Sequence, residues 1–249
     1  MAGCQKEDRI VPDCSNLFYG IYSPSGQVKE VSCGNETLLS PEWIGRRLTA
    51  VAYADSLDEA GVAVSHYYYD SHNRLASVDS SIVCTYNDEG LLASVKIILS
   101  GQTRTLMFLY RGQVQPYMVI DSSFHHESPS PAEWYSTSTT YNLEWSKGNL
   151  IKATPTNADM VRYEYIYDDN HNPFCGLVWS PVLEQEHLLQ HPSFFSLNNI
   201  VDVVGYNPDG SIGYYCHYGY DLYNTWPQVI YKSEGLNNNS PLMYSISYR

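Results

Sequence analysis

The stretch YYYDSHNRLASV (residues 67–78) is followed almost at once by TYNDEGLLASV (residues 85–95), which nearly repeats it. The shared pattern is an aromatic residue, Asp or Asn, two polar residues, Gly or Asn, any residue, and an apolar residue. It recurs at residues 206–212 and 220–226 and, shortened, at 145–150. Asp or Asn caps a turn with its side chain, and Gly or Asn takes the positive φ that the turn requires. We interpret each copy as a β-hairpin, with a type I turn plus glycine bulge as its geometry.

The segments between these turns alternate in polarity. Residues 212–220 and 242–248 each place apolar or aromatic side chains at every second position, and residues 137–145 alternate in the same way with Thr137, Thr139, Tyr141, Leu143 and Trp145 on one face. Period two predicts strands with one buried and one wetter face. Hairpins from about residue 50 to the end predict an all-β, antiparallel up-and-down meander of roughly 12 to 16 strands. We expect it to curl into a barrel or half-barrel, because closure removes exposed edges.

Helix signals are few. Ser40-Pro41 has the form of an N-cap followed by an N1 proline, which predicts a short helix to about Leu48. Residues 180–189 start in the same way and predict a second short helix, packed on the sheet or plugging one end. The domain division we expect is a tether over residues 1–20 and a single barrel-like domain over 21–249.

Composition excludes some partners. The net charge is −13, and the 14 Lys and Arg residues form no run longer than Arg46-Arg47, so neither nucleic acid nor an anionic membrane surface is expected as a partner. The chain has 23 Tyr and only 6 Phe. Tyrosine suits strands, because the ring packs on the pleated surface while the hydroxyl stays wet.

The N-terminus, Met1-Ala2-Gly3-Cys4, resembles the end of a bacterial lipoprotein signal, in which small residues precede the cysteine that is acylated. The apolar stretch that normally precedes such a site is not in the sequence, and an ordinary cytosolic N-terminus is the alternative. Gln5-Lys6-Glu7-Asp8 has the composition of a tether. Its Lys-acidic-acidic run resembles the signal that sends lipoproteins of Bacteroidetes to the cell surface. We expect lipid attachment at Cys4, contact with the membrane only through that lipid, and an outer-membrane, surface-exposed location in the cell envelope.

Five cysteines remain besides Cys4, and no CxxC pair exists, which excludes zinc ribbons and thioredoxin-like sites. Cys14 and Cys33 flank a short segment that they could staple, and buried free thiols are the alternative.

The repeated phrase resembles the YD repeat of RHS-type proteins. In the second half, residues 163–168 lead into Asn172-Pro173-Phe174-Cys175-Gly176-Leu177 and later into Phe195-Ser196-Leu197-Asn198-Asn199. This order is similar to a Bacteroidetes lipoprotein family of unknown function with a porin-like fold, over about residues 45–249. The resemblance implies a barrel-like fold and an envelope location, and it supplies no catalytic residues. "Porin-like" describes shape there, and the sequence shows no continuous lipid-facing band of a pore.

Catalytic and cofactor motifs are absent from the sequence: it has no G-x-S-x-G, no H-E-x-x-H and no phosphate-binding glycine loop. Residues 168–172 open like a calcium loop, but Pro173 stands where the loop needs glycine and Trp179 where it needs glutamate. His125-His126-Glu127 is a weak metal candidate, because adjacent residues of an extended segment point to opposite sides. We therefore expect no catalytic residue, metal or cofactor.

Aromatic residues near loops are the better candidates for binding, since rings at a barrel mouth can stack on sugars. The expected ligand-binding residues are Trp134, Tyr135, Trp179, Tyr223 and Trp226, the last with packing as its alternative role. The favoured function is a non-catalytic, envelope-anchored module that binds a glycan or a protein partner. Two alternatives are a glycan-directed hydrolase with paired carboxylates at the barrel mouth and a structural subunit of a surface complex.

Overall fold

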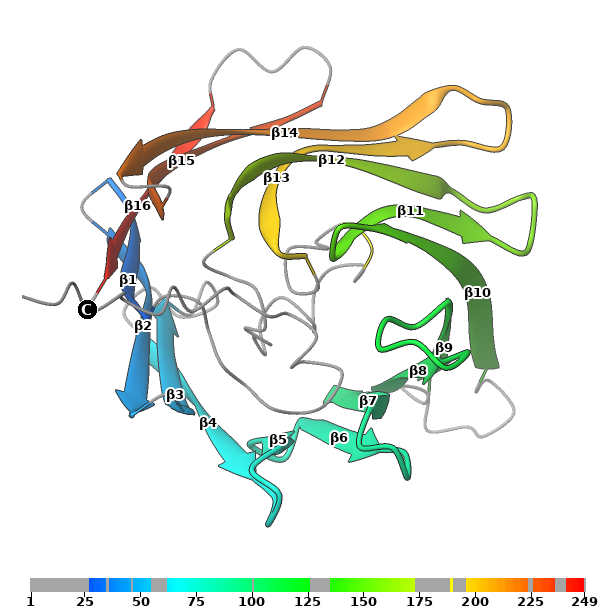
Figure 1. Cartoon of the computed structure of the whole chain (residues 1–249), viewed down its shortest axis with the longest axis horizontal. Helices are drawn as coiled ribbons and strands as arrows, with labels where there is room; N and C mark the ends of the chain where they lie inside the picture. The colour runs from blue at the N-terminus through cyan, green and yellow to red at the C-terminus, as the bar shows by residue number, and fades with distance from the viewer. Residues whose placement is uncertain are drawn as a thin grey trace, which may run out of the picture.

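The computed structural model describes residues 27–34, 36–45, 47–54, 62–99, 101–125, 135–172, 189, 196–223, 226–235 and 241–248. In these ranges the antiparallel strands β1 to β16 follow one another around a closed barrel (Figure 1). Each strand pairs with the next in sequence, and β1 pairs with β16, where Val28 lies opposite Tyr248. The strands are β1 (Val28–Cys33), β2 (Glu36–Ile44), β3 (Arg47–Ala54), β4 (Val62–Tyr69), β5 (Leu75–Val78), β6 (Ile82–Tyr86), β7 (Leu92–Leu99), β8 (Gln102–Leu109), β9 (Met118–His125), β10 (Tyr135–Ser146), β11 (Asn149–Pro155), β12 (Arg162–His171), β13 (Asn198–Tyr206), β14 (Ile212–Tyr223), β15 (Trp226–Glu234) and β16 (Leu242–Tyr248).

The predicted all-β, up-and-down barrel is confirmed in its closed form. Because the strands alternate in direction, all connections that follow even-numbered strands lie at one end of the barrel, which we call the even end. Connections that follow odd-numbered strands lie at the other, the odd end. The described barrel begins with β1 and finishes with β16 at the even end.

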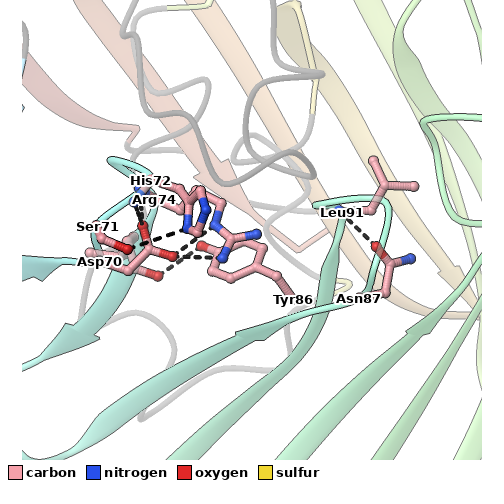
Figure 2. Close-up of polar contacts among 8 residues, drawn as sticks. Asp70, Ser71, His72, Arg74, Tyr86, Asn87 and Leu91 are labelled. Carbon is pink, nitrogen blue, oxygen red and sulfur yellow. Dashed lines mark hydrogen bonds and ion pairs between the residues drawn. The ribbon is translucent and has the colours of Figure 1, made fainter.

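The copies of the phrase that begin at Tyr69, Tyr86 and Tyr206 form the hairpin turns that the sequence predicts, the first two of which are drawn in Figure 2, whereas residues 221–223 of the copy at 220–226 still belong to β14. The Asp70 carboxylate accepts a hydrogen bond from the Arg74 backbone N–H at 2.8 Å, and the Asn87 side chain accepts one from Leu91 N–H at the same distance. In both turns the backbone N–H of the Asp or Asn donates in return to the carbonyl of the same partner. The short side chain thus closes the turn, which is why Asp or Asn follows the aromatic residue.

Positive φ occurs where the phrase has its Gly or Asn. Asn73 has φ 66°, Gly90 80° and Gly210 84°. The pairing register shifts just before each of these turns, as at the step from Tyr68 to Tyr69. This shift is the bulge that the pattern predicts.

An unforeseen feature explains the aromatic position in four of the five copies of the phrase, all except Tyr206, which ends β13 at the odd end. At the even end, a Tyr or Trp at or near the end of each even-numbered strand donates a hydrogen bond to a backbone carbonyl near the start of the strand before it. We call these eight side chains the aromatic collar. The pairs, donor first, are Trp43–Val28, Tyr69–Leu48, Tyr86–Leu75, Tyr110–Leu92, Trp145–Pro116, Tyr167–Leu150, Tyr220–Ile200 and Tyr248–Pro227.

The collar needs a donor at the tip of a large flat side chain, which Tyr and Trp carry and Phe lacks. The expectation that tyrosine hydroxyls stay wet is therefore wrong for the tyrosines of the collar. Burial raises the pKa of the Tyr69 hydroxyl to about 12, although the positive charge of nearby Arg47 opposes the shift. The preference of this sequence for Tyr over Phe has a structural reason at these positions.

The helix predicted from Ser40-Pro41 is wrong. Residues 40–44 belong to β2, where Leu39, Pro41 and Trp43 are buried and alternate with exposed Glu42. The alternation and the bond from Trp43 Nε1 to the β1 backbone outweigh the local cap signal. Of the second predicted helix, residues 180–188 lie outside the described residues.

The inner face of the described barrel holds an apolar cluster, with fully buried members on strands all around it, among them Val28, Ile82, Ile97, Val119 and Val203. Leu189 is also buried in this cluster, and its carbonyl accepts a hydrogen bond from the Tyr165 hydroxyl at 2.7 Å. Three cysteines, Cys33, Cys84 and Cys216, are free thiols. Cys14, the suggested partner of Cys33, lies outside the described residues.

Candidate functional site

The structure describes only part of the predicted site. Cys4, Trp134 and Trp179 lie outside the described residues. Tyr135 opens β10 at the odd end and is 57% exposed, whereas Tyr223 closes β14 at the even end and is 69% exposed. Trp226 opens β15, also at the even end, where it is half-buried and makes an edge contact with Tyr248 at 5.8 Å between ring centroids. Tyr135 is therefore separated from the other two residues by the length of the barrel.

Around Tyr135, the inner face of β8, β9 and β10 changes from apolar to polar toward the odd end. Residues that pair directly across antiparallel strands share a face. Phe108, Val119 and Tyr141 form a buried apolar row across the three strands. The next three rows toward the odd end, on the same face, are Leu106–Asp121–Thr139, Arg104–Ser123–Thr137 and Gln102–His125–Tyr135. We call the polar members of these three rows the polar wall.

An ion pair lies at the centre of the polar wall. Arg104 Nε lies 2.9 Å from Asp121 Oδ1 and its terminal nitrogen lies 2.6 Å from Oδ2, so the contact is bidentate. The two side chains are only 11% and 12% exposed. The two hydrogen bonds of the bidentate contact offset the desolvation cost of burying two charges. Removing one partner would leave the other charge buried and unpaired. The pair holds two planar polar groups in fixed positions, without adding net charge.

A stacked ring pair lies at the rim of the polar wall. The His125 and Tyr135 rings are 4.4 Å apart between centroids with an interplanar angle of 12°. The two residues are direct partners in the β9–β10 ladder, which is why their rings meet face to face. Tyr135 thus has one ring face on His125, while much of the side chain remains open to solvent.

The polar wall does not have the geometry of a hydrolase site. Asp121 is its only carboxylate, and it is paired with a cation instead of facing a second acid. Elsewhere, hydrogen bonds from Ser211 lower the pKa of Asp209, which is opposite to what a general acid needs. Among the described residues no group of three His, Cys, Asp or Glu side chains is placed to hold a metal ion. Of the His125-His126-Glu127 candidate, only His125 is described.

His217 and Asp202, on the outer face of the sheet, are arranged like the His–Asp pair of a Ser-His-Asp catalytic triad. His217 Nδ1 lies 2.8 Å from Asp202 Oδ1, and Ser233 is the next residue in the ladder row. The Tyr215 hydroxyl also donates to Asp202, at 2.9 Å. His217 is exposed on the outer face of the sheet, so it lacks the water-excluding surroundings that such catalysis uses. We assign it no catalytic role.

The two motif stretches of the family resemblance meet in one hydrogen-bonded network at the even end. Asn172 Nδ2 donates to the Ser196 carbonyl at 2.8 Å, and the Ser196 hydroxyl donates to the Tyr167 hydroxyl at 2.8 Å. Asn198 exchanges two hydrogen bonds with Asn149 of β11. Asn172 and Ser196 are buried, and their hydrogen bond joins the residue that follows β12 to a residue just before β13. Their role in the described structure is architectural.

Comparisons with known proteins give resemblance in shape alone. No protein-family model matches the chain. No curated protein matches it either. Similar solved structures include a porin-like protein from Bacteroides uniformis, at 13% identity and a TM-score of 0.48, and a porin-like protein from Bacteroides vulgatus, at 12% identity and a TM-score of 0.43. The first alignment covers 89% of this chain and 95% of that protein, and the second covers 90% and 99%. Among the described residues, no helix is long and apolar enough to cross a membrane.

Proposed function

We propose that this chain is a non-catalytic binding module of a bacterial cell envelope and that the polar wall at the odd end takes a glycan. The observation that carries this proposal is the exposed Tyr135, stacked on His125 at the rim of a row of fixed polar groups. Small-molecule sites combine ring surfaces with a few precisely placed polar groups. Below the rim, the Arg104–Asp121 pair and the hydroxyls of Thr137 and Thr139 supply planar and hydroxyl partners for a polyhydroxylated ligand.

The charge balance of the polar wall favours a neutral ligand. Its one Arg and one Asp neutralise each other at hydrogen-bond distance. A charged ligand would have to break that bidentate pair, whereas sugar hydroxyls can both donate to Asp121 and accept from Arg104 without breaking it. We therefore expect neutral glycans to bind better than acidic ones at this end.

The test is a glycan array with the purified protein and two matched variants. Tyr135→Ala and Tyr223→Ala each remove one tyrosine that is more than half exposed, so both should fold, but they lie at opposite ends of the barrel. We expect binding to be lost in Tyr135→Ala and kept in Tyr223→Ala. The proposal fails if no glycan binds, or if the two variants behave alike.

The envelope location is a second part of the proposal and is tested separately. It rests on the lipoprotein-like start at Cys4, the tether over residues 1–20 and the family resemblance. Mass spectrometry of the mature N-terminus should show an acylated Cys4, and Cys4→Ala should release the protein from the membrane fraction. An unmodified N-terminus would refute the anchor without affecting the glycan site.

A further inference from the structure

A depression of about 290 Å³ lies on the outside of the barrel at the odd end, between the β11–β12 and β13–β14 connections. Six of the residues that line it carry the argument: Thr154, Thr156, Met160, Arg162, Tyr206 and Pro208. Their outward position follows from their neighbours, since Ala153 and Tyr163 are buried on the inner face. The volume is at the small end of the range for small-molecule sites, which suits one sugar ring or one amino acid.

Arg162 is the only cation of this lining. Its guanidinium lies over the Tyr206 ring, 4.7 Å from the centroid, and the two residues are direct partners in the β12–β13 ladder. The stacking limits the rotation of the guanidinium and leaves its edge available for hydrogen bonds. Its Nε is buried and makes no hydrogen bond with the described residues, although Glu164 Oε1 lies 3.4 Å away.

The ion-pair contacts of Arg162 are long. Glu164 is shared between Arg162 and Lys152, whose Nζ lies 3.7 Å from the same oxygen. Two cations therefore share one carboxylate, and both contacts are longer than a hydrogen bond. At the rim, the Asp209 carboxylate accepts hydrogen bonds from the backbone and the hydroxyl of Ser211, so it is engaged in its own turn. Glu144 lies directly opposite Lys152 in the β10–β11 ladder, so these four residues hold two cations and two carboxylates. The contact of Arg162 with Glu164 nevertheless stays longer than a hydrogen bond, which leaves the guanidinium able to accept a closer carboxylate.

We propose that this depression binds a small ligand through a carboxylate group, which Arg162 receives on its free edge. Arginine forms paired parallel hydrogen bonds with a carboxylate, and a ring behind the guanidinium fixes its plane for this contact. The side chains of Met160 and Pro208 provide apolar surface for the body of the ligand, and the hydroxyls of Thr154 and Thr156 provide polar partners. Two sources share this chemistry, an acidic sugar and the carboxylate end of a peptide or amino acid.

Titrations followed by NMR test the proposal with four probes on the ¹⁵N-labelled full chain. Glucuronate represents the acidic sugars and N-acetylglycine the peptide end, and the amide of each is its neutral control. We expect the Arg162 Nε resonance to shift with at least one of the two acids and with neither amide. The acid that binds identifies the source.

Three variants make the test specific. Arg162→Gln should weaken binding of the acid at least about tenfold, because a hydrogen-bonded charge pair is lost. Glu164→Gln should strengthen it, because the competing carboxylate is removed. Arg111→Gln makes the same charge change at another arginine, which lies 3.9 Å over Tyr117 at the even end, and should leave binding unchanged.

The proposal is overturned if neither acid binds, if an amide binds as well as its acid, or if Arg162→Gln binds like Arg111→Gln. Because the depression lies outside the barrel and the polar wall inside it, these results are independent of the glycan array.

Discussion

The collar hydrogen bond of Tyr86 can be removed by a single-atom change, Tyr86→Phe. The Tyr86 hydroxyl donates to the Leu75 carbonyl at 2.7 Å, and its burial raises the pKa of that hydroxyl. The ring would stay in place, with Arg74 still stacked 4.3 Å above it (Figure 2). The variant therefore isolates the donor from the packing of the ring.

The expected loss in the free energy of unfolding is about 1–2 kcal/mol. A typical intramolecular hydrogen bond contributes about 1 kcal/mol net to stability, and a buried acceptor that is left without a hydrogen bond costs somewhat more. For a chain of 249 residues, 1 kcal/mol corresponds to a Tm change of about 2–4 °C, which calorimetry resolves. Urea unfolding followed by circular dichroism gives the same quantity independently.

The matched control is Tyr68→Phe. Tyr68 is the neighbour of a collar residue in sequence, but its side chain is 54% exposed on the outer face. Removing its hydroxyl should change stability by less than about 0.5 kcal/mol. If Tyr86→Phe and Tyr68→Phe have equal effects, the collar bonds contribute nothing measurable and the reasoning is wrong. A second collar variant, Tyr220→Phe on the distant strand β14, should add to Tyr86→Phe without coupling.

Three further predictions concern turns and titration. Gly148→Ala should destabilise the fold by more than Gly210→Ala in urea unfolding. Both glycines have φ near +80°, but a Cβ at Gly148 would lie 2.2 Å from Leu197 Cδ1, whereas Gly210 has open space; equal losses would refute a role for that contact. Asp70→Ala should cost about 1 kcal/mol at neutral pH and less below pH 4. Hydrogen bonds from the Arg74 and His72 backbones and the Arg74 side chain outweigh burial and lower the pKa of Asp70, so its contribution is lost as pH falls; a pH-independent loss in thermal unfolding would contradict this. The folded pKa of about 12 for Tyr69 lies above the ordinary 10.0, so its contribution is complete below pH 10 and disappears between pH 10 and 12. Absorbance at 295 nm recorded with circular dichroism should therefore show phenolate forming as the barrel unfolds, and full ionisation of tyrosine in a still-folded protein would contradict it.

The fold was predictable because its signals are local. The Asp70 and Asn87 turns and the period-two segments each lie within a dozen residues of sequence, and together they specify a meander. The helix expected from Ser40-Pro41 failed because a cap signal of two residues competed with alternation over the whole of β2. The role of the tyrosine hydroxyls was missed, because the contact between Tyr86 and its acceptor Leu75 depends on the register of β5 against β6. The sequence predicts that these strands are neighbours but not which residues meet.

The candidate sites were less predictable, because they depend on register. Arg104 and Asp121 meet only because β8 and β9 pair with these two residues one row apart on the inner face. Arg162 lies against Tyr206 by the same kind of pairing, between residues that are far apart in sequence. The search for aromatic residues near loops selected both Tyr135 and Tyr223, and composition alone could not tell which end of the barrel each one occupies. The strand order decides the end of each residue. Tyr135 comes directly after the connection from odd-numbered β9 and so lies at the odd end, whereas Tyr223 is the last residue of even-numbered β14 and lies at the even end.

The even end and the odd end of the barrel differ in structure. At the even end, the aromatic collar ties each pair of strands together, and the Asn172–Ser196 network closes the longest connection. At the odd end lie both regions that we propose to bind ligands, the polar wall inside and the Arg162 depression outside. The connections at the odd end can vary in sequence without disturbing the barrel, because the collar hydrogen bonds that join neighbouring strands lie a strand length away, at the even end. The copies of the repeated phrase at the even end therefore specify the scaffold, whereas specificity can be built at the odd end, by the copy at residues 206–212 and by residues outside the phrase such as Tyr135 and Arg162.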